Sequence, residues 1–431
     1  MTEATAHFPN SVVASVESMA QQARQAAPLL ARSSGAVRNR ALGIMADRLL
    51  AQQQPLLEAN HRDLEAAQQA GLAPALIDRL RVDAAGIAAM ATGLRQIAAL
   101  PDPIGEVSEL RVRPNGMSVG RMRVPLGVMA IIYESRPNVT ADAVGLCIKS
   151  GNAIILRGGS EAHHSNQAIA ACLTAAVADA GLPAAVVQCL ATPDRAAVGA
   201  LLRCDRWIDV VIPRGGKGLI QRVIEESHIP VIKHLDGICH TYIDRYADLA
   251  MAIELTFNGK MQRTAVCNAT EILLVHEAIA ADFLPQVGDR LHQAGCELRG
   301  CPRTLQHLTA AAIPAVAATD RDWDTEFLAP ILAIRVVDRF DEALLHIAAH
   351  SSQHTDVIVT RDHDRAMRFL REVDSSAVMV NASSRFNDGF QFGLGAEMGI
   401  STDKLHVRGP VGLEGLTCQK YIVLGSGQLR T

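Results

Sequence analysis

In the first hundred residues the apolar positions recur three and four residues apart, a pattern typical of amphipathic helices. A clear run of such positions is Leu42, Ile44, Met45, Leu49 and Leu50. Gly35 and Gly71 punctuate the pattern, as glycine often does at helix ends. We therefore expect helices over three stretches, Ser15 to Gly35, Ala36 to Gly71 and Ala73 to Leu100.

Two short, partly alternating runs follow, Val107 to Val112 and Met117 to Val124, with Pro114-Asn115-Gly116 between them. Asn-Gly between two such runs is a strong hairpin signal. The flanks carry several arginines, so this hairpin is a poor candidate for a buried core. It is either an arm for subunit pairing or an exposed hairpin of its own domain without a role in assembly, and the sequence leaves both alternatives open.

Between Gly127 and Ile232 short apolar runs alternate with helical segments. Strands are expected at Val128 to Ile132, Ala153 to Leu156, Val186 to Leu190, Ile208 to Ile212 and Pro230 to Ile232. Helices are expected at Ala141 to Ser150, Ser160 to Ala180, Ala196 to Leu202 and Lys217 to Ser227. Repeated βαβ units predict a parallel sheet with helices on both faces. Ligands of such sheets bind beyond the carboxyl ends of the strands.

A second α/β series begins after His234. Its strands are expected at Thr241 to Ile243, Ile272 to Val275, Pro330 to Val337, Asp356 to Thr360 and Val378 to Asn381. Its helices are expected at Leu249 to Phe257, Glu277 to Ala294, Glu342 to Ala349 and His363 to Glu372. The glycine-rich stretch from Asn387 to Gly412 is too apolar for a flexible linker, so we expect ordered loops there and a final strand at Tyr421 to Leu424.

Composition places the chain among ordinary globular proteins. It has 431 residues, 49% of them apolar and 20% charged, which suggests two or three domains. The net charge of −4 gives no bulk attraction to nucleic acid or anionic membranes, and the apolar runs are too short to span a bilayer. Met1 to Ala14 has no secretory signal pattern. The nine cysteines are therefore expected to be reduced thiols in the cytoplasm.

Cys267 lies between a basic run that contains Lys260 and Arg263 and an apolar run from Ile272 to Val275. The apolar run predicts a buried strand, which places Cys267 in a turn near the start of that strand. Such a turn suits a nucleophile, because nearby cations and backbone N–H groups lower the pKa of a thiol. The competing interpretation is that Cys267 is inert packing, as most free cysteines are.

The other cysteines are weaker candidates for a metal site or a nucleophile. One group has spacing at the wide edge of the zinc pattern: Cys296, Cys301, His292 and His307. No second closely spaced pair accompanies it, so we predict no metal site. Cys239 and His240 are adjacent, and adjacent residues of a strand point to opposite faces. They are therefore poor partners for nucleophilic catalysis.

Two loops are built like anion-binding loops, Leu156-Arg-Gly-Gly-Ser-Glu161 and Pro213-Arg-Gly-Gly-Lys-Gly218. Each follows a strand and starts a helix, whose first N–H groups can bind a phosphate that glycine lets approach. The candidate cofactor-binding residues are Arg157, Gly158, Gly159, Ser160, Arg214, Gly215 and Gly216. Arg157 would suit a 2′-phosphate. Neither loop is a Rossmann or Walker fingerprint, so tight turns without a ligand are the alternative.

The polar loop Tyr133-Glu-Ser-Arg-Pro-Asn-Val-Thr140 follows the first strand of this series. Asn138 can donate a hydrogen bond to an oxyanion, and Arg136 can hold a phosphate or carboxylate. The alternative is that Ser135 or Asn138 caps the helix that follows.

Six runs carry a resemblance to a known family: Tyr133 to Thr140, Lys149 to Glu161, Ile212 to Gly216, His234 to Gly237, Gln262 to Ala269 and Arg385 to Thr402. They resemble motifs of the aldehyde dehydrogenase superfamily, in particular its branch that reduces glutamyl phosphate. The similarity extends in order from the N-terminal helices to Gly425. Gly259 and Thr264 depart from it, since alanine and proline are expected there.

The resemblance implies an aldehyde dehydrogenase-like α/β fold. A Rossmann-type NADPH-binding domain would comprise residues 1–105 and 123–233. A second α/β domain with the nucleophilic cysteine would comprise residues 234–409. Residues 106–122 and 410–431 would form a small β arm for oligomerisation.

The resemblance also implies a reaction. NADPH reduces L-glutamyl 5-phosphate to L-glutamate 5-semialdehyde and phosphate in L-proline biosynthesis, through a thioester on Cys267. Asn138 and the Cys267 N–H would bind the oxyanion, and Glu326 resembles the glutamate that holds the nicotinamide ribose. Candidates for binding the substrate are Arg136, Arg385 and Arg408. We expect a homo-oligomer without nucleic-acid or membrane partners, and transient contact with a separate glutamate 5-kinase is a hypothesis.

Hydrolytic aldehyde dehydrogenases carry a glutamate that activates water, and the matching position here is His234. The missing carboxylate fits an enzyme whose thioester is reduced, although a histidine can also act as a base. Two rival functions are a hydrolysing semialdehyde dehydrogenase of the same fold and a catalytically silent nucleotide-binding or scaffold protein.

Overall fold

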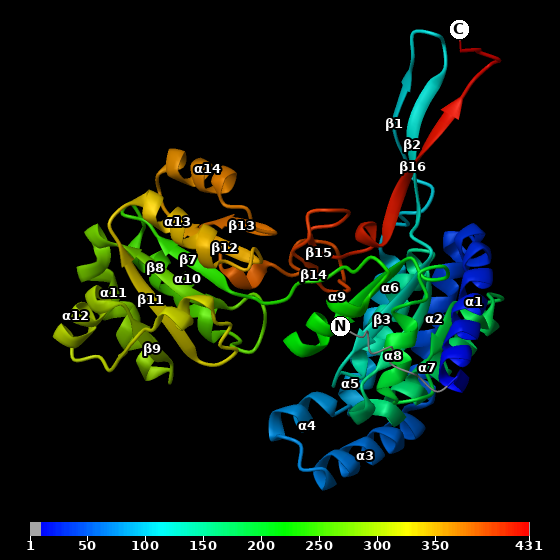
Figure 1. Cartoon of the computed structure of the whole chain (residues 1–431), viewed down its shortest axis with the longest axis horizontal. Coiled ribbons are helices and arrows are strands. Elements are labelled where there is room, and N and C mark those ends of the chain that lie inside the picture. The colour runs from blue at the N-terminus through cyan, green and yellow to red at the C-terminus, as the bar shows by residue number, and fades with distance from the viewer. Residues whose placement is uncertain (1–9, 431) are drawn as a thin grey trace, which may run out of the picture. The chain divides into compact units, whose positions relative to one another are not determined.

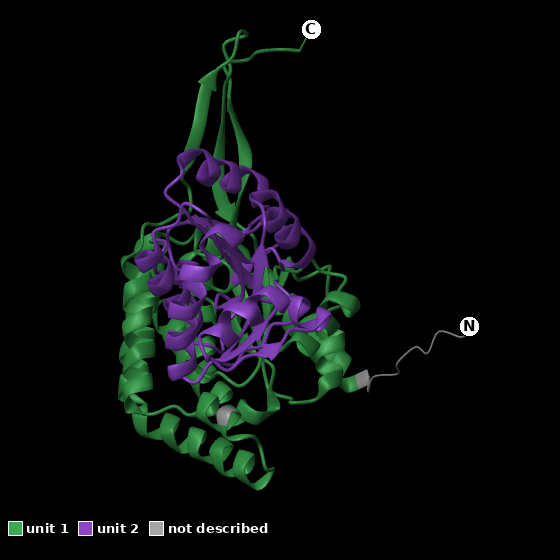
Figure 2. Ribbon diagram, turned by 90° about the vertical axis from the view of Figure 1, so that its left-hand side faces the viewer, with its two compact units in different colours: residues 1–233, 393–399, 411–431 green, residues 234–392, 400–410 purple. Residues whose placement is uncertain are grey.

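The structure is a computed structural model that describes residues 10–430. The first nine residues, which belong to the predicted cofactor domain and to the N-terminus predicted to lack a signal, lie outside the described residues. The chain forms two compact units (Figure 2). Unit 2 comprises His234–Phe392 and Ile400–Pro410, and unit 1 comprises the rest, including Gly393–Gly399. Within residues 10–430, no helix is long and apolar enough to cross a membrane.

Five helices open unit 1 and replace the three predicted stretches. They are α1 (Asn10–Arg32), α2 (Gly35–Ala51), α3 (Gln53–Gln69), α4 (Pro74–Leu80) and α5 (Ala84–Ala99). The break between α2 and α3 has a local cause, because Pro55 lacks an N–H and fits the first turn of a new helix better than a helix interior. The second break occurs where the Asp83 carboxylate accepts a hydrogen bond from Gly86 N–H over 2.7 Å and caps α5.

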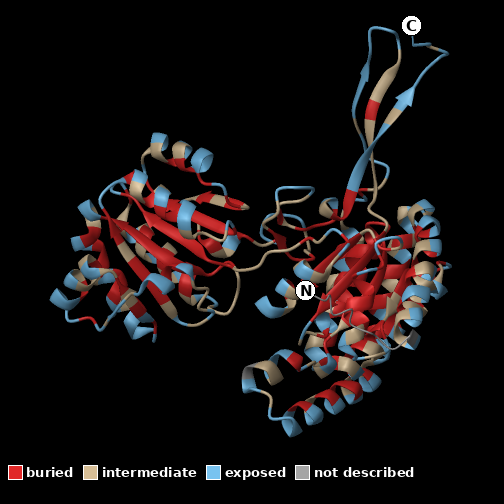
Figure 3. Cartoon of the chain, viewed as in Figure 1, coloured by how far each residue is buried: buried red, intermediate tan, exposed pale blue. Residues whose placement is uncertain are grey.

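Unit 1 contains a parallel four-stranded sheet in the order β5-β4-β3-β6. The strands are β3 (Val128–Tyr133), β4 (Ala153–Gly158), β5 (Val187–Cys189) and β6 (Val210–Arg214). The connecting segments include α6 (Asn138–Lys149), α7 (His163–Asp179), α8 (Arg195–Leu201) and α9 (Lys217–Glu226), with short turns η1 (Ser160–Ala162) and η2 (Ala184–Val186). Every residue of β3 is buried (Figure 3), as expected for a strand covered on both faces.

The strand predicted at Pro230 to Ile232 is wrong. This segment makes one isolated parallel bridge, between Val211 and Val231. A proline at its first position removes a donor from the ladder, and the run is too short to extend beyond the bridge.

Three antiparallel strands form the arm: β1 (Val107–Val112), β2 (Ser118–Pro125) and β16 (Thr417–Leu424), in the order β1-β2-β16 (Figure 1). The predicted hairpin is confirmed, and the last strand begins four residues earlier than expected. Its pairing with β2 places Tyr421 opposite Arg121, whose guanidinium lies 5.3 Å from the Tyr421 ring centroid. Large apolar side chains of the arm stay exposed, with Val112 at 74% and Tyr421 at 68%.

Unit 2 is built on a parallel seven-stranded sheet in the order β10-β9-β11-β8-β7-β12-β13. The strands are β7 (Cys239–Ile243), β8 (Thr270–His276), β9 (Glu297–Gly300), β10 (Val316–Ala317), β11 (Ile331–Val337), β12 (Thr355–Val359) and β13 (Ala377–Val380). Its helices are α10 (Leu249–Met261), α11 (Glu277–Gln293), α12 (Pro302–Ala310), α13 (Phe340–His350) and α14 (His363–Glu372). Short elements complete the unit: η3 (Asp320–Asp324), η4 (Ser384–Phe386), β14 (Ile400–Ser401) and β15 (Gly409–Pro410).

Strand β8 lies at the centre of the sheet of this unit and contributes side chains to two hydrophobic cores. Leu273 and Val275 belong to the core on one face, and Ile272 and Leu274 belong to the core on the other, because successive side chains of a strand point to opposite faces. The whole strand is buried. The residues that precede it are therefore held by a rigid element.

Candidate active site

Cys267 lies on the loop between α10, which ends at Met261, and β8, which begins at Thr270. An ion pair ties the two ends of this loop together, because Lys260 Nζ donates to the carboxylate of Glu271 and both side chains are fully buried. The Cys267 side chain itself is half-buried. The predicted seat of Cys267, a turn before a core strand, is confirmed.

Two residues near the start of β7 hold the backbone of Cys267. A Cβ built on Gly237 would lie 2.1 Å from the Cys267 carbonyl oxygen and 2.6 Å from its Cα, so this close approach requires glycine. The Cys239 thiol donates to the same oxygen over 3.1 Å. Burial raises the pKa of Cys239 well above its ordinary value, so it is a positioning donor and no second nucleophile. The adjacent His240 bonds instead to Asp356.

Two histidines stand beside the thiol. One nitrogen of each ring and Cys267 Sγ lie within 4.8 Å of one another, and the ring centroids of His234 and His354 are 5.2 Å apart. His234 Nδ1 lies 2.8 Å from the carbonyl oxygen of Ile400. Because a carbonyl only accepts, Nδ1 carries the proton of the neutral ring and Nε2 carries the lone pair.

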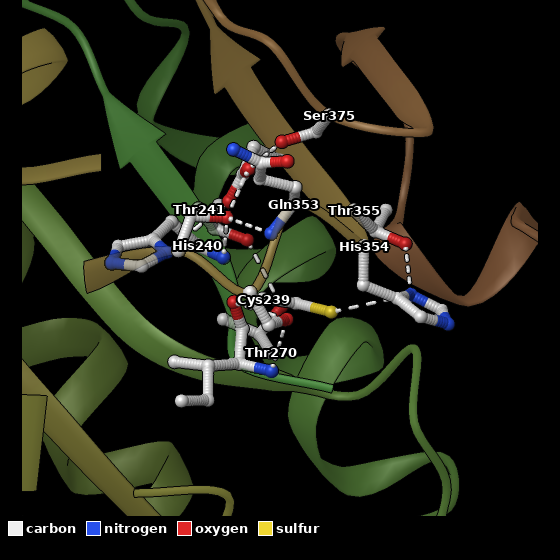
Figure 4. A network of polar contacts seen from close by, with 12 residues as sticks. Cys239, His240, Thr241, Thr270, Gln353, His354, Thr355 and Ser375 are labelled. Carbon is white, nitrogen blue, oxygen red and sulfur yellow. Dashed lines mark hydrogen bonds and ion pairs between the residues drawn. The ribbon is translucent and has the colours of Figure 1, made fainter. Parts of the chain in front are cut away.

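His354 was missed in the sequence, since nothing near it resembles a motif. It is fully buried and immediately precedes β12. Its Nδ1 lies 2.8 Å from Thr355 Oγ1 and faces the Cys239 thiol (Figure 4). Its Nε2 is buried and has no hydrogen-bond partner in the structure.

The segment around η4 packs against the other side of the nucleophile loop. Asn268 Nδ2 donates to the carbonyl oxygen of Asn387 over 2.9 Å, and Arg385 Nε donates to Gln262 Oε1 over 2.9 Å. Burial lowers the pKa of Arg385, and the charge of a Cys267 thiolate opposes that shift. The guanidinium is therefore close enough to favour the thiolate electrostatically.

The buried ion pair also reaches the loop that carries Glu326. The second oxygen of Glu271 accepts a hydrogen bond from Leu328 N–H over 3.3 Å, and Lys260 Nζ lies 5.9 Å from the Phe327 ring centroid. Leu328 adopts a positive φ of 52°, which L-residues seldom adopt without such support. Burial raises the pKa of Glu271 to about 7.

In unit 1 the three polar loops begin at the carboxyl ends of three neighbouring strands, which end in register. The last residues of β3, β4 and β6 are register partners: Tyr133 with Gly158, and Tyr133 with Arg214. The loops at residues 133–138, 158–162 and 214–217 therefore lie side by side at the carboxyl ends of the strands, where parallel sheets bind ligands.

Two carboxylates that the sequence reasoning overlooked connect these loops. Glu161 accepts hydrogen bonds from Ser135 N–H and Oγ at 2.7 and 2.9 Å. Glu134 accepts one from Gly216 N–H at 2.9 Å. The loop N–H groups therefore already bind anionic oxygens, which is the chemistry expected of a phosphate site. A Cβ on Gly159 would lie 2.2 Å from Glu161 Oε1, so a larger residue there would displace the Glu161 carboxylate.

Arg157 is largely buried, and desolvation lowers the pKa of its guanidinium. Nη1 donates to the Gly158 carbonyl over 3.0 Å and Nη2 to the Pro193 carbonyl over 2.9 Å. Nε is buried without a hydrogen-bond partner in the structure. Because a guanidinium has five N–H donors, these bonds leave donors for a ligand.

Asn138 is the first residue of α6 and is exposed. The capping alternative is wrong, because the residue at the N-cap is Pro137 and no side chain caps the helix. Asn138 Nδ2 instead donates to Asp142 over 3.3 Å, and burial raises the pKa of Asp142 to about 6. Asn138 belongs to unit 1 and Cys267 to unit 2, so their pairing at an oxyanion stays a prediction.

The other predicted residues have different surroundings. Arg136 is half-buried in the loop before α6, whereas Arg408 donates to the Asp374 carboxylate over 2.6 Å and to its backbone oxygen over 2.9 Å. Cys296 is packed in a core of unit 2. Among residues 10–430, neither Cys296 nor Cys301 belongs to the one group of side chains close enough together to hold a metal ion.

Gly259, one of the two departures from the family pattern, has a steric reason. A Cβ there would lie 2.7 Å from Thr270 Oγ1, which in turn bonds to Thr241 and Ser384 hydroxyls at 2.9 and 3.1 Å. A side chain at position 259 would therefore displace the Thr270 hydroxyl from these hydrogen bonds.

Comparisons with known proteins show the family to which the chain belongs. The aldehyde dehydrogenase family model matches residues 1–299 and 302–400. A gamma-glutamyl phosphate reductase of Magnetococcus marinus is 63% identical over 422 residues, which are 98% of this chain and all of that protein. The crystal structure of gamma-glutamyl phosphate reductase from Thermotoga maritima is 42% identical, with a TM-score of 0.94 over 96% of this chain and 100% of that one.

A more distant structure shares the fold. An acetylating aldehyde dehydrogenase from Geobacillus thermoglucosidasius is 17% identical over 98% of each chain, with a TM-score of 0.67. The chain therefore belongs to the aldehyde dehydrogenase family, and within it to the gamma-glutamyl phosphate reductases. The predicted fold class is confirmed, and the protein is an oxidoreductase of a family that uses a nicotinamide cofactor.

Proposed function

We propose that the protein reduces L-glutamyl 5-phosphate to L-glutamate 5-semialdehyde with NADPH, releasing phosphate, as a step of L-proline biosynthesis. The observation that carries this proposal is a half-buried cysteine, seated before a core strand beside two histidines. It occurs in a chain 63% identical to a protein named gamma-glutamyl phosphate reductase.

Cys267 is the proposed nucleophile. Its thiol proton passes to Nε2 of His234, whose Nδ1 is engaged by the Ile400 carbonyl, and Arg385 stabilises the resulting thiolate. The thiolate attacks the acyl carbon, the bond from that carbon to the phosphate oxygen breaks, and a thioester remains. The Cys267 N–H and the Asn138 amide are the proposed donors to the oxyanion.

The nicotinamide cofactor supplies the hydride that reduces the thioester to the aldehyde. Around it, the glycine loops at Arg157 to Ser160 and Arg214 to Gly216 are proposed to bind phosphate oxygens, with Arg157 facing a 2′-phosphate. Glu326 is proposed to hold the nicotinamide ribose. Glu271 positions that loop by accepting the Leu328 N–H.

For the substrate, we propose Arg385 as the first cation that the phosphate or carboxylate meets, because its charge interacts with that of Cys267. Arg136 is a second candidate. Arg408 is the weakest of the three, since Asp374 already binds its guanidinium.

His234 also distinguishes the proposed reductase from the rival hypothesis, a hydrolysing semialdehyde dehydrogenase. A thioester that waits for hydride must be protected from water, and His234 replaces the carboxylate that activates water in hydrolytic relatives. The test runs the reaction backwards, measuring NADP reduction driven by glutamate 5-semialdehyde. We expect activity only with phosphate or arsenate present, whereas equal rates without them would establish hydrolysis.

Two further measurements complete the test. Cys267→Ala is expected to abolish turnover while its melting temperature stays near that of the wild type, and the exposed Cys418 provides a matched control as Cys418→Ala. Unchanged turnover in Cys267→Ala would remove this residue from the mechanism, whereas absence of turnover in the wild type would favour a silent nucleotide-binding protein.

We also propose a setting for the enzyme. A free thiol at Cys267 must stay reduced, which the cytoplasm ensures. The arm of β1, β2 and β16 is proposed to pair subunits, because its apolar side chains are exposed in the single chain. Direct transfer of the labile acyl phosphate from a separate glutamate 5-kinase remains a hypothesis, tested by competition with free substrate in a coupled assay.

A further inference from the structure

Cys267, His234 and His354 gather three ligand atoms within 4.8 Å of one another. We propose that these three side chains bind one Zn²⁺ ion through Cys267 Sγ and the Nε2 atoms of His234 and His354, and that the bound ion reversibly inhibits the enzyme. One thiolate and two imidazoles are ligands that zinc prefers. The sequence predicted no such site, because the three residues are far apart along the chain and come together only in the folded unit 2.

Each imidazole is arranged as a metal ligand would be. A histidine that binds a metal through one nitrogen donates its other N–H to an oxygen nearby, which fixes the ring and its tautomer. His234 Nδ1 lies 2.8 Å from the Ile400 carbonyl oxygen, and His354 Nδ1 lies 2.8 Å from Thr355 Oγ1. Both rings are therefore anchored at Nδ1. The Ile400 carbonyl can only accept, which places the lone pair of His234 on Nε2. The Thr355 hydroxyl can accept from His354 Nδ1, and in that tautomer the lone pair of His354 is also on Nε2.

His354 also has a buried nitrogen that the protein leaves unsatisfied. Its side chain is fully buried, yet Nε2 has no hydrogen-bond partner in the structure. A buried polar atom without a partner is unfavourable, and a metal ion would satisfy it. The nearby Cys239 thiol is no competing ligand, since it donates to the Cys267 carbonyl.

The distances permit a tetrahedral ion. Ligand atoms around Zn²⁺ are about 3.5 Å apart, given bonds of about 2.0–2.3 Å. The observed limit of 4.8 Å requires the half-buried side chains of Cys267 and His234 to move by about an ångström toward His354. Water fills the fourth position.

Zinc binding releases one proton. The Cys267 thiol releases its proton to solvent as the sulfur–zinc bond forms, and both imidazoles bind as neutral rings. The zinc-bound sulfur is then unavailable for attack on the acyl carbon. The inhibition rests on the proposed function, whereas the binding site does not.

The experiment measures binding and inhibition separately. Inhibition is measured as phosphate-dependent turnover with Zn²⁺ present and again after a chelator has removed it. Cobalt(II), which occupies zinc sites and reports thiolate ligation by a charge-transfer absorption band, is titrated into the full-length protein. Zn²⁺ affinity is then measured by competition with a chromophoric chelator. The variants are Cys267→Ser, His354→Gln and Thr355→Val. Controls are Cys418→Ser and His292→Ala, which remove exposed side chains. Melting temperatures verify that each variant is folded.

We expect one ion per chain, a thiolate–cobalt band absent from Cys267→Ser, and wild-type affinity in both controls. His354→Gln should weaken zinc by more than about a hundredfold, and Thr355→Val by roughly tenfold to a hundredfold, the range for a partner outside the ligand set. Unchanged affinity in His354→Gln, or no thiolate band, would overturn the site. Zinc bound at this site without loss of turnover would contradict the inhibition and the nucleophilic role of Cys267, while the metal site itself would stand.

Discussion

Gly237 packs directly against the backbone of Cys267, so Gly237→Ala is expected to displace the proposed nucleophile. The added Cβ would lie 2.1 Å from the Cys267 carbonyl oxygen, 2.6 Å from its Cα and 2.7 Å from its carbonyl carbon. All three are backbone atoms, so no side-chain rotation relieves the clash. The Cys267 loop must move instead.

The size of the movement sets the expected loss. Ordinary van der Waals contact begins at 3.4 Å, so the two backbones must separate by about 1.3 Å. A misplacement of about 1 Å at a reacting atom costs roughly a hundredfold in rate, equivalent to about 2.7 kcal/mol of activation free energy. Overpacking should lower stability by roughly 1–3 kcal/mol.

The assay is steady-state kcat for phosphate-dependent NADP reduction, together with the rate at which iodoacetamide alkylates Cys267. Gly43→Ala is the matched control, because a Cβ there meets nothing within 4 Å, and alanine in a helix is stabilising. We expect a loss of about a hundredfold in kcat for Gly237→Ala and none for the control. Wild-type kcat and alkylation rate in a folded Gly237→Ala protein would refute the argument that this glycine positions the nucleophile.

Three further predictions concern other parts of the chain. Arg157→Ala should weaken NADPH binding by about 10- to 100-fold, the equivalent of a charge-assisted hydrogen bond, and leave NADH binding nearly unchanged, as measured by fluorescence titration; equal losses would reject the 2′-phosphate role. Lys260→Met should lower the free energy of unfolding by about 3–5 kcal/mol, because Glu271 is left buried without its partner, and adding Glu271→Leu should restore most of it; no loss in a urea melt would contradict this. Burial raises the pKa of Asp142 from 3.8 to about 6, so between these pH values the folded protein keeps a proton that the unfolded chain releases. The free energy of unfolding should therefore fall as pH rises from 3.8 to about 6. Asp142→Asn should flatten that slope, and parallel pH curves of the variant and the wild type would disprove the assignment.

Local patterns predicted much of the fold. Continuous apolar runs located β3, β4, β8 and β11, and Asn115-Gly116 located the hairpin. Elements with weaker patterns were missed. β9 is four residues long with two of them buried, too short for a periodic signal, and α12 follows it directly. Pro230 to Ile232 was overpredicted, because an apolar run does not show whether a neighbouring strand is available to pair with it.

By itself, the sequence predicted most of the helices and strands in order and identified Cys267 as the nucleophile candidate, since these depend on residues close together in the chain. Tertiary structure decided what surrounds that thiol. His354, Cys239 and Gly237 come from strands and loops distant in sequence, and β7, β8 and β12 bring them together because they are neighbours in one sheet. Strand adjacency is set by packing of the whole unit, which no local window of sequence records.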